Sequence, residues 1–255
     1  MVSTDAKINV TDLDKTIRGK DKSLLVLRKV NLHVMEGEVV SILGPSGCGK
    51  TTLLNILAGL DEADVGNLNI SGVQTSKRLG SVAYMQQKDL LLPWRSMLSN
   101  AILGLEVQGV SKDIAKDRAL NYFEEFGLSG FEDEYPFALS GGMRQRVAFI
   151  RTLLLDSDVL LLDEPFSALD ALSRVRLQEW FLELMDSIPK TVVLVTHDVE
   201  EAIFLSDRIY VMSARPGEIN EIISIPFSRP RDFDVVGHEL FVQLKTRLLS
   251  ILRGM

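Results

Sequence analysis

Residues 44–51 read Gly44-Pro45-Ser46-Gly47-Cys48-Gly49-Lys50-Thr51, which matches the phosphate-loop pattern G-x-x-x-x-G-K-[ST] in full. The apolar run 38–43 before it predicts a strand, and the pattern 50–60 after it predicts a helix. Glycines let the backbone wrap around phosphate oxygens, while successive N–H groups point inward at the start of a helix. The alternative, a strand-to-helix turn with an incidental lysine, is disfavoured by this context. The segment therefore predicts a phosphate site.

Individual residues of this loop receive roles from phosphate chemistry. Lys50 would reach the β- and γ-phosphates of a nucleotide, and the Thr51 hydroxyl would coordinate Mg²⁺. Cys48 occupies a variable position of the pattern, where a small filler is a simpler interpretation than a redox thiol. We expect the whole loop, together with the following Thr52, to bind the nucleotide.

The rest of the chain alternates short apolar runs with longer helical patterns. Strands are predicted at 7–10, 32–34, 38–43, 82–85, 159–163, 191–196 and 208–212, and helices at 50–60, 114–126, 142–155 and 173–185. The runs 159–163 and 191–196 are apolar throughout, as expected for strands covered on both faces of a largely parallel sheet. We therefore predict an α/β fold with a phosphate-loop nucleotide-hydrolase core.

Two segments depart from this alternation. Residues 96–155 read as consecutive helices, so we predict a helical subdomain inserted into a single domain of residues 1–255. Residues 215–255 carry three prolines (Pro216, Pro226 and Pro230), and an amphipathic pattern follows at 241–252. We expect this part to be a short C-terminal extension whose helix docks on the core.

Composition excludes several function classes. The net charge of −7 argues against a general nucleic-acid binder, which needs a broad basic surface. A single cysteine rules out an internal disulfide, and the three histidines have no zinc-ligand spacing. No signal peptide is visible, and no apolar run approaches the roughly 20 residues that span a bilayer. We expect a cytosolic protein that meets a membrane only through a partner.

Residues 159–164 form a buried strand that ends in two acids, Asp163 and Glu164. In an α/β sheet, ligands bind beyond the carboxyl ends of the strands, so both carboxylates are expected to face the phosphate loop. Asp163 would hold the Mg²⁺ shell, and Glu164 would accept a proton from the attacking water. An acidic turn at a strand end is the alternative, which a complete phosphate loop nearby makes less plausible.

The segment Leu139-Ser140-Gly141-Gly142-Met143-Arg144-Gln145-Arg146 resembles the signature of the ATP-binding-cassette (ABC) family, usually written LSGGQ. Met143 stands where the family usually has glutamine, and the serine and glycine amides remain. In the family this segment faces the γ-phosphate held by a second subunit. The resemblance therefore implies that Ser140, Gly141 and Gly142 bind nucleotide across a subunit interface.

Further segments match the family in the same order along the chain. Gln87, chosen over the adjacent Gln86, resembles the glutamine that contacts Mg²⁺ and the attacking water. Asp170 resembles the D-loop aspartate, which crosses to the partner subunit. His197, at the end of another apolar strand, resembles the switch histidine that contacts the γ-phosphate, although a lone histidine there is ordinarily a cap or core residue.

One position departs from the family. Its members commonly stack adenine on an aromatic side chain from an early strand, and the matching position here is Ile17. Apolar contact with adenine remains, whereas ring stacking of about 1 kcal/mol would be lost. We therefore expect the phosphate contacts to be better defined than the base contact.

The resemblance implies an ATPase that uses ATP and Mg²⁺. Two copies, or one copy and a close paralogue, would form a head-to-tail pair that encloses two ATP molecules. Its catalytic residues would be Glu164, His197, Gln87 and Lys50, and its metal ligands Thr51, Gln87 and Asp163.

The task implied by the resemblance is import. The segments Tyr135-Pro136, Ser213-Ala214-Arg215-Pro216-Gly217 and Arg229-Pro230-Arg231 look like the nitrate/sulfonate/taurine importer group. The chain would then act at the cytoplasmic face of the inner membrane on a separate permease, served by an extracytoplasmic solute-binding protein. The permease would meet the segment around Trp94, although a core-packed tryptophan is equally compatible with the sequence. The alternative is a non-transport ABC ATPase of the regulatory or DNA-repair type, the latter needing a long coiled coil.

Overall fold

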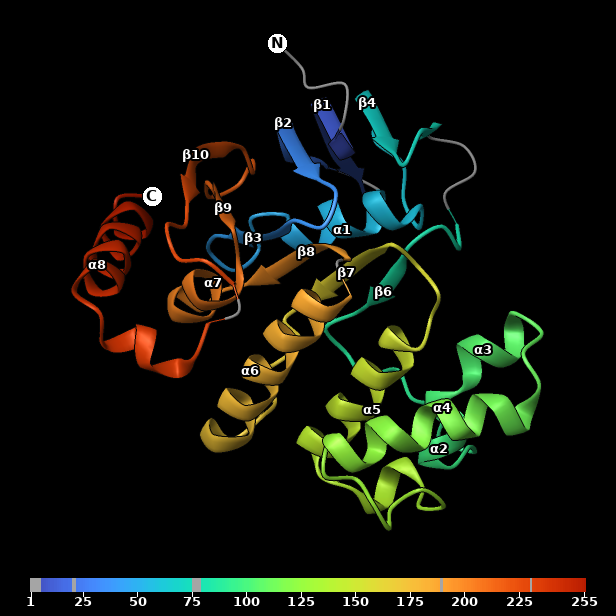
Figure 1. Cartoon of the computed structure of the whole chain (residues 1–255). Coiled ribbons are helices and arrows are strands. Elements are labelled where there is room, and N and C mark those ends of the chain that lie inside the picture. Colours follow the sequence, from blue (N-terminus) through green and yellow to red (C-terminus); the bar gives the residue numbers. More distant parts are fainter. Residues whose placement is uncertain (1–5, 20–21, 75–78, 189, 230) are drawn as a thin grey trace.

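The computed structural model describes residues 6–19, 22–74, 79–188, 190–229 and 231–255, which form a layered α/β architecture (Figure 1). The main sheet has six strands in the order β10-β9-β3-β8-β7-β6. Its strands are parallel, except that β10 runs antiparallel to β9. They comprise β3 (Val39–Leu43), β6 (Ala83–Met85), β7 (Val159–Asp163), β8 (Thr191–Thr196), β9 (Arg208–Met212) and β10 (Ile219–Ser224).

The central strands β3, β7 and β8 are buried along their whole length. Alternate side chains enter two different cores: Leu160 and Leu162 pack into one, and Val159 and Leu161 into the other. Because side chains of a strand point alternately to opposite faces, a strand covered on both sides must be apolar throughout. The prediction of a parallel α/β core is confirmed.

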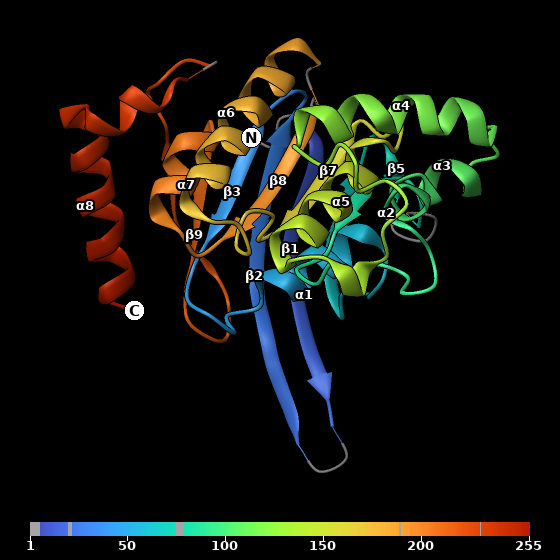
Figure 2. The ribbon, with the colours of Figure 1, turned by 90° about the horizontal axis from the view of Figure 1, so that it is seen from below.

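A second sheet of four strands, in the order β2-β1-β4-β5, packs with helix α1 (Lys50–Ala58) over one face of the main sheet. It consists of β1 (Ala6–Arg18), β2 (Ser23–Met35), β4 (Val65–Ile70) and β5 (Val73–Gln74). Figure 2 shows β1 and β2 as a long hairpin that extends beyond the body of the molecule. The predicted strands at 7–10 and 32–34 are therefore too short, and β4, β5 and β10 were not predicted.

Helices cover the other face of the main sheet. Residues 96–155 are all described, and they contain α2 (Met97–Ala101), α3 (Leu103–Val107), α4 (Lys112–Glu125), a 3₁₀ helix (Pro136–Ala138) and α5 (Gly141–Leu153). No strand interrupts this segment, which projects to one side of the sheet in Figure 1. The helices α6 (Ala171–Ser187) and α7 (Val199–Leu205) follow the strands β7 and β8 and complete the layer.

The C-terminal part of the chain lies along the sheet edge beyond α7. A 3₁₀ helix (Phe233–Gly237) leads into α8 (Glu239–Arg253), which buries Phe241, Leu244 and Leu248. The predicted docking helix is thus present. The main sheet, however, continues past residue 215, since β10 belongs to it, and Pro230 lies outside the described residues. Within the described part of the chain, none of the helices has the length and apolar character needed to cross a membrane.

Candidate nucleotide site

The phosphate loop joins β3 to α1 and closes around one ammonium group. Lys50 Nζ donates hydrogen bonds to the carbonyl oxygens of Gly44 (2.7 Å) and Pro45 (3.0 Å), and it lies 3.9 Å from Cys48 Sγ. The side chain is only 7% exposed. The backbone therefore holds this positive charge at the N-terminus of α1, where the helix dipole adds to its attraction for an anion.

Two features of the loop explain residue types within it. Gly49 has a φ of +114°, and a Cβ there would lie 2.7 Å from Leu27 Cδ2, so a side chain is excluded on conformation and on space. Cys48 is buried, and burial raises the pKa of its thiol. A thiol that stays protonated and inaccessible agrees with the prediction of a small filler rather than a reactive group.

Thr51 and Asp163 meet at the base of the loop. Thr51 Oγ1 donates a hydrogen bond of 2.7 Å to Asp163 Oδ2 across α1 and β7. Asp163 is only 1% exposed, and burial raises the pKa of its carboxyl against the opposing effect of the Thr51 hydrogen bond. The structure thus joins the end of the buried strand to the first turn of α1, as the sequence predicted.

This donor set fits Mg²⁺. A hydroxyl, a carboxylate and the Gln87 side-chain oxygen are hard ligands, and Mg²⁺ at nucleotide sites takes its remaining ligands from phosphate and water. The described residues contain no cluster of three or more His, Cys, Asp or Glu side chains that could hold a metal ion by themselves. A site completed by phosphate oxygens is therefore the arrangement that these residues support.

Glu164 follows Asp163 in a conformation that few side chains adopt. Its φ is +51°, and its N–H donates a hydrogen bond of 2.9 Å to Val195 O in β8. A non-glycine residue at positive φ persists only where surrounding contacts hold it, and such residues concentrate at functional sites. Gln145 Nε2 adds contacts to Glu164 O (3.4 Å) and Pro165 O (3.3 Å). The turn is therefore held by β8 and α5.

Two polar side chains contact the Glu164 carboxylate. Gln87 Nε2 donates to Oε2 at 3.2 Å, and His197 Nδ1 lies 3.1 Å from Oε1. These residues follow the strands β6 and β8, so three strand ends converge on one carboxylate. Gln87 rather than Gln86 makes this contact. The arrangement orients a carboxylate that could accept a proton from a water molecule bound next to the phosphate loop.

A cavity of about 450 Å³ lies over the loop, and we call it the P-loop pocket. Its lining residues are Ile17, Leu24, Val26, Ser46, Gly47, Gly49, Lys50, Thr51, Thr52, Gln87, Asp163, Glu164 and Arg215. The lining thus combines apolar side chains of β1 and β2 with the phosphate loop and the two acids. An apolar side next to a phosphate cradle suits a nucleotide, whose base is flat and uncharged.

Comparison with known proteins identifies the family. A family model described as ABC transporter matches residues 27–167. The chain belongs to the ABC transporter family. It is 40% identical to the aliphatic sulfonates import ATP-binding protein SsuB of Bacillus thuringiensis subsp. konkukian, over 95% of this chain and 94% of that one. It is 36% identical to the nitrate import ATP-binding protein NrtD of Synechocystis sp., over 97% and 95%.

A solved structure supports the same assignment of fold and activity. A dimeric post-hydrolysis state of the ATP-binding cassette MJ0796, bound to ADP and phosphate, superimposes with a TM-score of 0.79. It is 31% identical to this chain and covers 87% of it, and the match includes all of that structure. The chain is therefore an ABC ATPase that binds ATP, and the prediction of the family is confirmed.

The signature residues of this ABC ATPase lie outside its own P-loop pocket. Ser140 caps α5, with its Oγ accepting a hydrogen bond of 3.3 Å from Met143 N, and both Ser140 and Gly141 are exposed. Asp170 caps α6 in the same way, its Oδ1 accepting from Ser173 N at 3.0 Å. One copy of the ABC ATPase thus contains the phosphate cradle and the acids, while the predicted signature contacts face outward.

Several residues of the site were not predicted from the sequence. Leu24, Val26 and Arg215 line the P-loop pocket, and Gln145 supports the Glu164 turn. Arg215 was noted only as part of a segment typical of an importer group. The signal available in the sequence was a basic residue in a turn that directly follows a buried strand. That strand, β9, pairs with β3, which precedes the phosphate loop.

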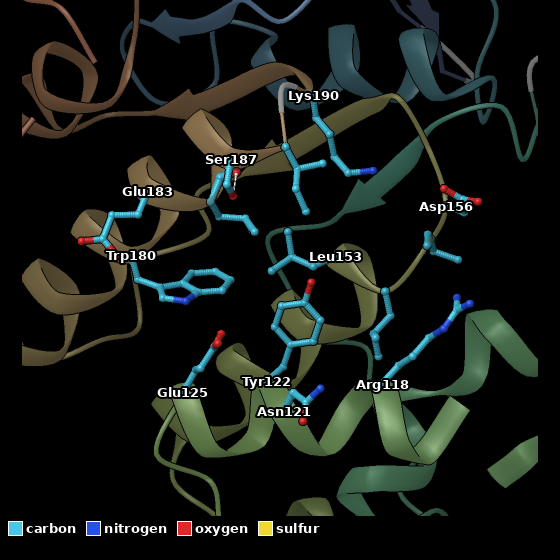
Figure 3. Close-up of a pocket in the computed structure, with 14 residues that line it drawn as sticks. Arg118, Asn121, Tyr122, Glu125, Leu153, Asp156, Trp180, Glu183, Ser187 and Lys190 are labelled. Atoms are coloured by element: carbon cyan, nitrogen blue, oxygen red, sulfur yellow. Dashed lines mark hydrogen bonds between the residues drawn. The ribbon is translucent and has the colours of Figure 1, made fainter. Parts of the chain in front are cut away.

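A larger cavity of about 840 Å³ lies elsewhere, between α4, the end of α5 and α6 (Figure 3). Tyr122 and Trp180 line it, with ring centroids 5.9 Å apart, and charged side chains such as Arg118 and Glu183 lie at its rim. No predicted site residue lines this cavity. Size alone therefore does not identify the nucleotide site of this ABC ATPase, whereas the chemistry of the P-loop pocket does.

Proposed function

We propose that this ABC ATPase energises solute import through a separate membrane permease. It would act as a head-to-tail pair on the cytoplasmic face of the membrane, with a solute-binding protein as an indirect partner. The observation that carries the proposal is a segment with exposed apolar side chains, Leu90 and Trp94, that begins at the glutamine in contact with the Glu164 carboxylate. The names of the two import ATP-binding relatives support the same task.

This segment runs from Gln87 to Trp94 and contains both buried and exposed residues. Trp94 is 72% exposed, and Leu90 is also exposed, so the alternative of a core-packed tryptophan does not hold. An exposed aromatic beside an arginine, here Arg95, is typical of the centre of a protein interface. We infer that a cytoplasmic loop of the permease binds here.

Polar contacts tie this segment to the signature helix. Asp89 accepts a hydrogen bond of 3.0 Å from Arg144 Nε, and Arg151 donates to the carbonyl oxygens of Asp89 (2.6 Å) and Leu90 (3.0 Å). Arg144 lies four residues after Ser140 on α5. A movement of Trp94 caused by the permease could therefore be transmitted in two directions. Asp89 would transmit it to the signature helix through Arg144, and Gln87 would transmit it to the Glu164 carboxylate.

Hydrolysis would use the residues already described. Lys50 and the loop amides would hold the β- and γ-phosphates, while Thr51 and Asp163 would hold Mg²⁺, which supplies neutralisation of phosphate charge. Glu164, oriented by Gln87 and His197, would accept the proton of the attacking water. Relatives of the import type favour this task over a regulatory role, and the longest described helix, α6 with 17 residues, falls short of a coiled-coil arm.

The metal assignment predicts a specific change in Mg²⁺ dependence. Asp163→Asn should raise the Mg²⁺ concentration for half-maximal ATP hydrolysis by about 10- to 100-fold, because one oxygen of the metal shell loses its charge. The measurement is a Mg²⁺ titration at fixed ATP. Asp158→Asn is the matched control, since Asp158 precedes the same strand and forms an exposed ion pair with Lys7. An unchanged Mg²⁺ requirement in Asp163→Asn would remove this residue from the metal site.

If the segment from Gln87 to Trp94 binds the permease, a substitution there should abolish the stimulation of ATP hydrolysis by the permease and leave basal ATP hydrolysis unchanged. In vesicles carrying the permease, solute and solute-binding protein should stimulate ATP hydrolysis of the wild type. Trp94→Ala should lose most of this stimulation, since truncating a central aromatic weakens an interface by about 2 kcal/mol or more, which is roughly 30-fold. Hydrolysis by the isolated subunit should be unaffected. Val242→Ala, which shortens an exposed apolar side chain on α8, is the control. Retained stimulation in Trp94→Ala would refute this docking site.

A further inference from the structure

The apolar side chains that line the P-loop pocket are aliphatic in the described part of the chain. Among the described residues that line the pocket, none is Phe, Tyr or Trp. Ile17 is 49% exposed, Leu24 is also exposed, and Val26 is buried. Aliphatic side chains can cover one face of a purine, but they lack the π surface that makes base stacking strong. Another group must supply that interaction if the base is to be held firmly.

Arg215 reaches the same pocket from the turn between β9 and β10. Its Nε and Nη2 atoms both donate hydrogen bonds to Gly47 O, at 3.0 and 2.5 Å. One edge of the planar guanidinium is therefore anchored on the outer rim of the phosphate loop, while the side chain as a whole remains exposed and lines the pocket. Arg215 therefore lines the same pocket as the phosphate loop and the apolar side chains of Ile17 and Leu24.

The turn that carries Arg215 is held from both sides. Gly217 N donates to Val26 O at 2.8 Å, and Arg28 N donates to Gly217 O at 3.0 Å, so two backbone hydrogen bonds join the turn to β2. On the other side Gly217 packs against the phosphate loop, where a Cβ would come within 2.3 Å of Cys48 O. Ser213 closes the turn through its Oγ, which accepts from Glu218 N at 2.9 Å. The backbone of Arg215 is thus fixed relative to both walls of the pocket.

Among the residues that the structure describes, no acidic side chain pairs with the charge of Arg215. Nearby arginines are paired, Arg28 with Glu218 and Arg208 with Glu38, whereas within the described residues no carboxylate lies at ion-pair distance from Arg215. A guanidinium stacks well on flat π systems, and it is weakly hydrated compared with an ammonium group. An anchored, uncompensated guanidinium beside an apolar wall is therefore suited to one face of a nucleobase.

We propose that Arg215 forms one wall of the base site and stacks on adenine, in place of an aromatic side chain at position 17. Gly47 O orients the guanidinium plane, and the apolar side chains of β1 and β2 cover the rest of the base. This inference rests on the P-loop pocket being the ATP site. Arg215 would then contribute affinity for the base, in addition to the affinity that the phosphate contacts provide.

The test separates the base from the phosphates by using two probes. Calorimetric titration of the intact protein would measure the Kd of the Mg²⁺ complex of a non-hydrolysable ATP analogue and that of Mg²⁺-tripolyphosphate, which has no base. Arg215→Ala should weaken binding of the ATP analogue by roughly tenfold, as expected for losing one stacking contact, and leave tripolyphosphate binding unchanged. Arg215→Lys should behave like alanine, because it keeps the charge and loses the plane.

A rescue variant distinguishes stacking on the base from a role of Arg215 that only supports the phosphate loop. Adding Ile17→Tyr to Arg215→Ala should restore most of the lost ATP affinity, since the new ring lines the same pocket. Arg28→Ala is the matched control, because it removes an exposed arginine next to the turn and should not change either Kd. Melting curves without nucleotide would verify that each variant is folded.

Each other outcome overturns the inference. Equal loss for both probes would make Arg215 a phosphate contact, and unchanged binding of both would remove it from the site. A loss that Ile17→Tyr does not restore would assign Arg215 to supporting the phosphate loop. If the wild type bound neither probe, the assignment of the P-loop pocket as the ATP site would be wrong. This outcome is distinguishable from a failure of the Arg215 proposal, in which the wild type still binds the ATP analogue.

Discussion

Glu164→Gln is expected to lower the rate of ATP hydrolysis by about 100- to 10,000-fold, the range that a positioned general base contributes. The amide has nearly the same shape, and its oxygen can still accept a hydrogen bond from His197, while its nitrogen cannot take up a proton. The positive φ of Glu164 and its contact with Val195 O belong to the backbone and should persist. The variant should therefore remain folded and bind MgATP.

Single-turnover hydrolysis and equilibrium binding of ATP together measure this prediction. Affinity for MgATP should stay close to that of the wild type while turnover falls, because the substitution removes proton acceptance and leaves the phosphate loop intact. Glu124→Gln on the exposed surface of α4 is the control for a general effect of losing a carboxylate. Normal turnover in Glu164→Gln would transfer the base role to another group.

The core of this site could be predicted from the sequence because its determinants are local. The phosphate loop, the strand before it and the helix after it occupy residues 39–58 without interruption. The Asp163–Glu164 pair follows a strand whose apolar run already indicates burial on both faces. Parallel strands bring their carboxyl ends to one edge, so the meeting of Thr51 with Asp163 follows from topology.

Other parts could not be predicted, because long-range packing decides them. β10 is the edge strand of the main sheet, and β4 has only the two-residue strand β5 on its outer side. Both strands carry exposed polar residues, so neither shows the apolar pattern of a central strand. The strands β1 and β2 run far beyond the short apolar runs because they pair with each other along 13 residues each. Arg215 joins the pocket only through a turn that β2 and the phosphate loop hold in place.

The outward position of Ser140 leads to the prediction that most directly tests assembly. Ser140→Arg should block hydrolysis, because a long cation at the tip of α5 would prevent it from closing on a nucleotide held by a partner. Lys50→Ala should also be inactive, since it removes the ammonium group at the phosphate cradle. Each variant keeps the residue that the other one lacks. A head-to-tail pair of two copies of the same variant would nevertheless contain two damaged composite sites.

Mixing the two inactive variants should restore hydrolysis. In a mixed pair, Lys50 of the Ser140→Arg copy would face Ser140 of the Lys50→Ala copy, which forms one intact composite site. Random pairing of equal amounts makes half of the pairs mixed, so about a quarter of the wild-type number of intact sites is expected. The readout is phosphate release from the mixture compared with each variant alone.

The matched control replaces one component of the mixture by the double variant Ser140→Arg with Lys50→Ala. A pair of Ser140→Arg and this double variant has no composite site with both residues intact, so it should stay inactive at the same protein concentration. Recovery in the first mixture and none in the second can arise only if the two residues act across the interface. Equal activity in both mixtures would contradict a composite site that Lys50 of one copy shares with Ser140 of the other.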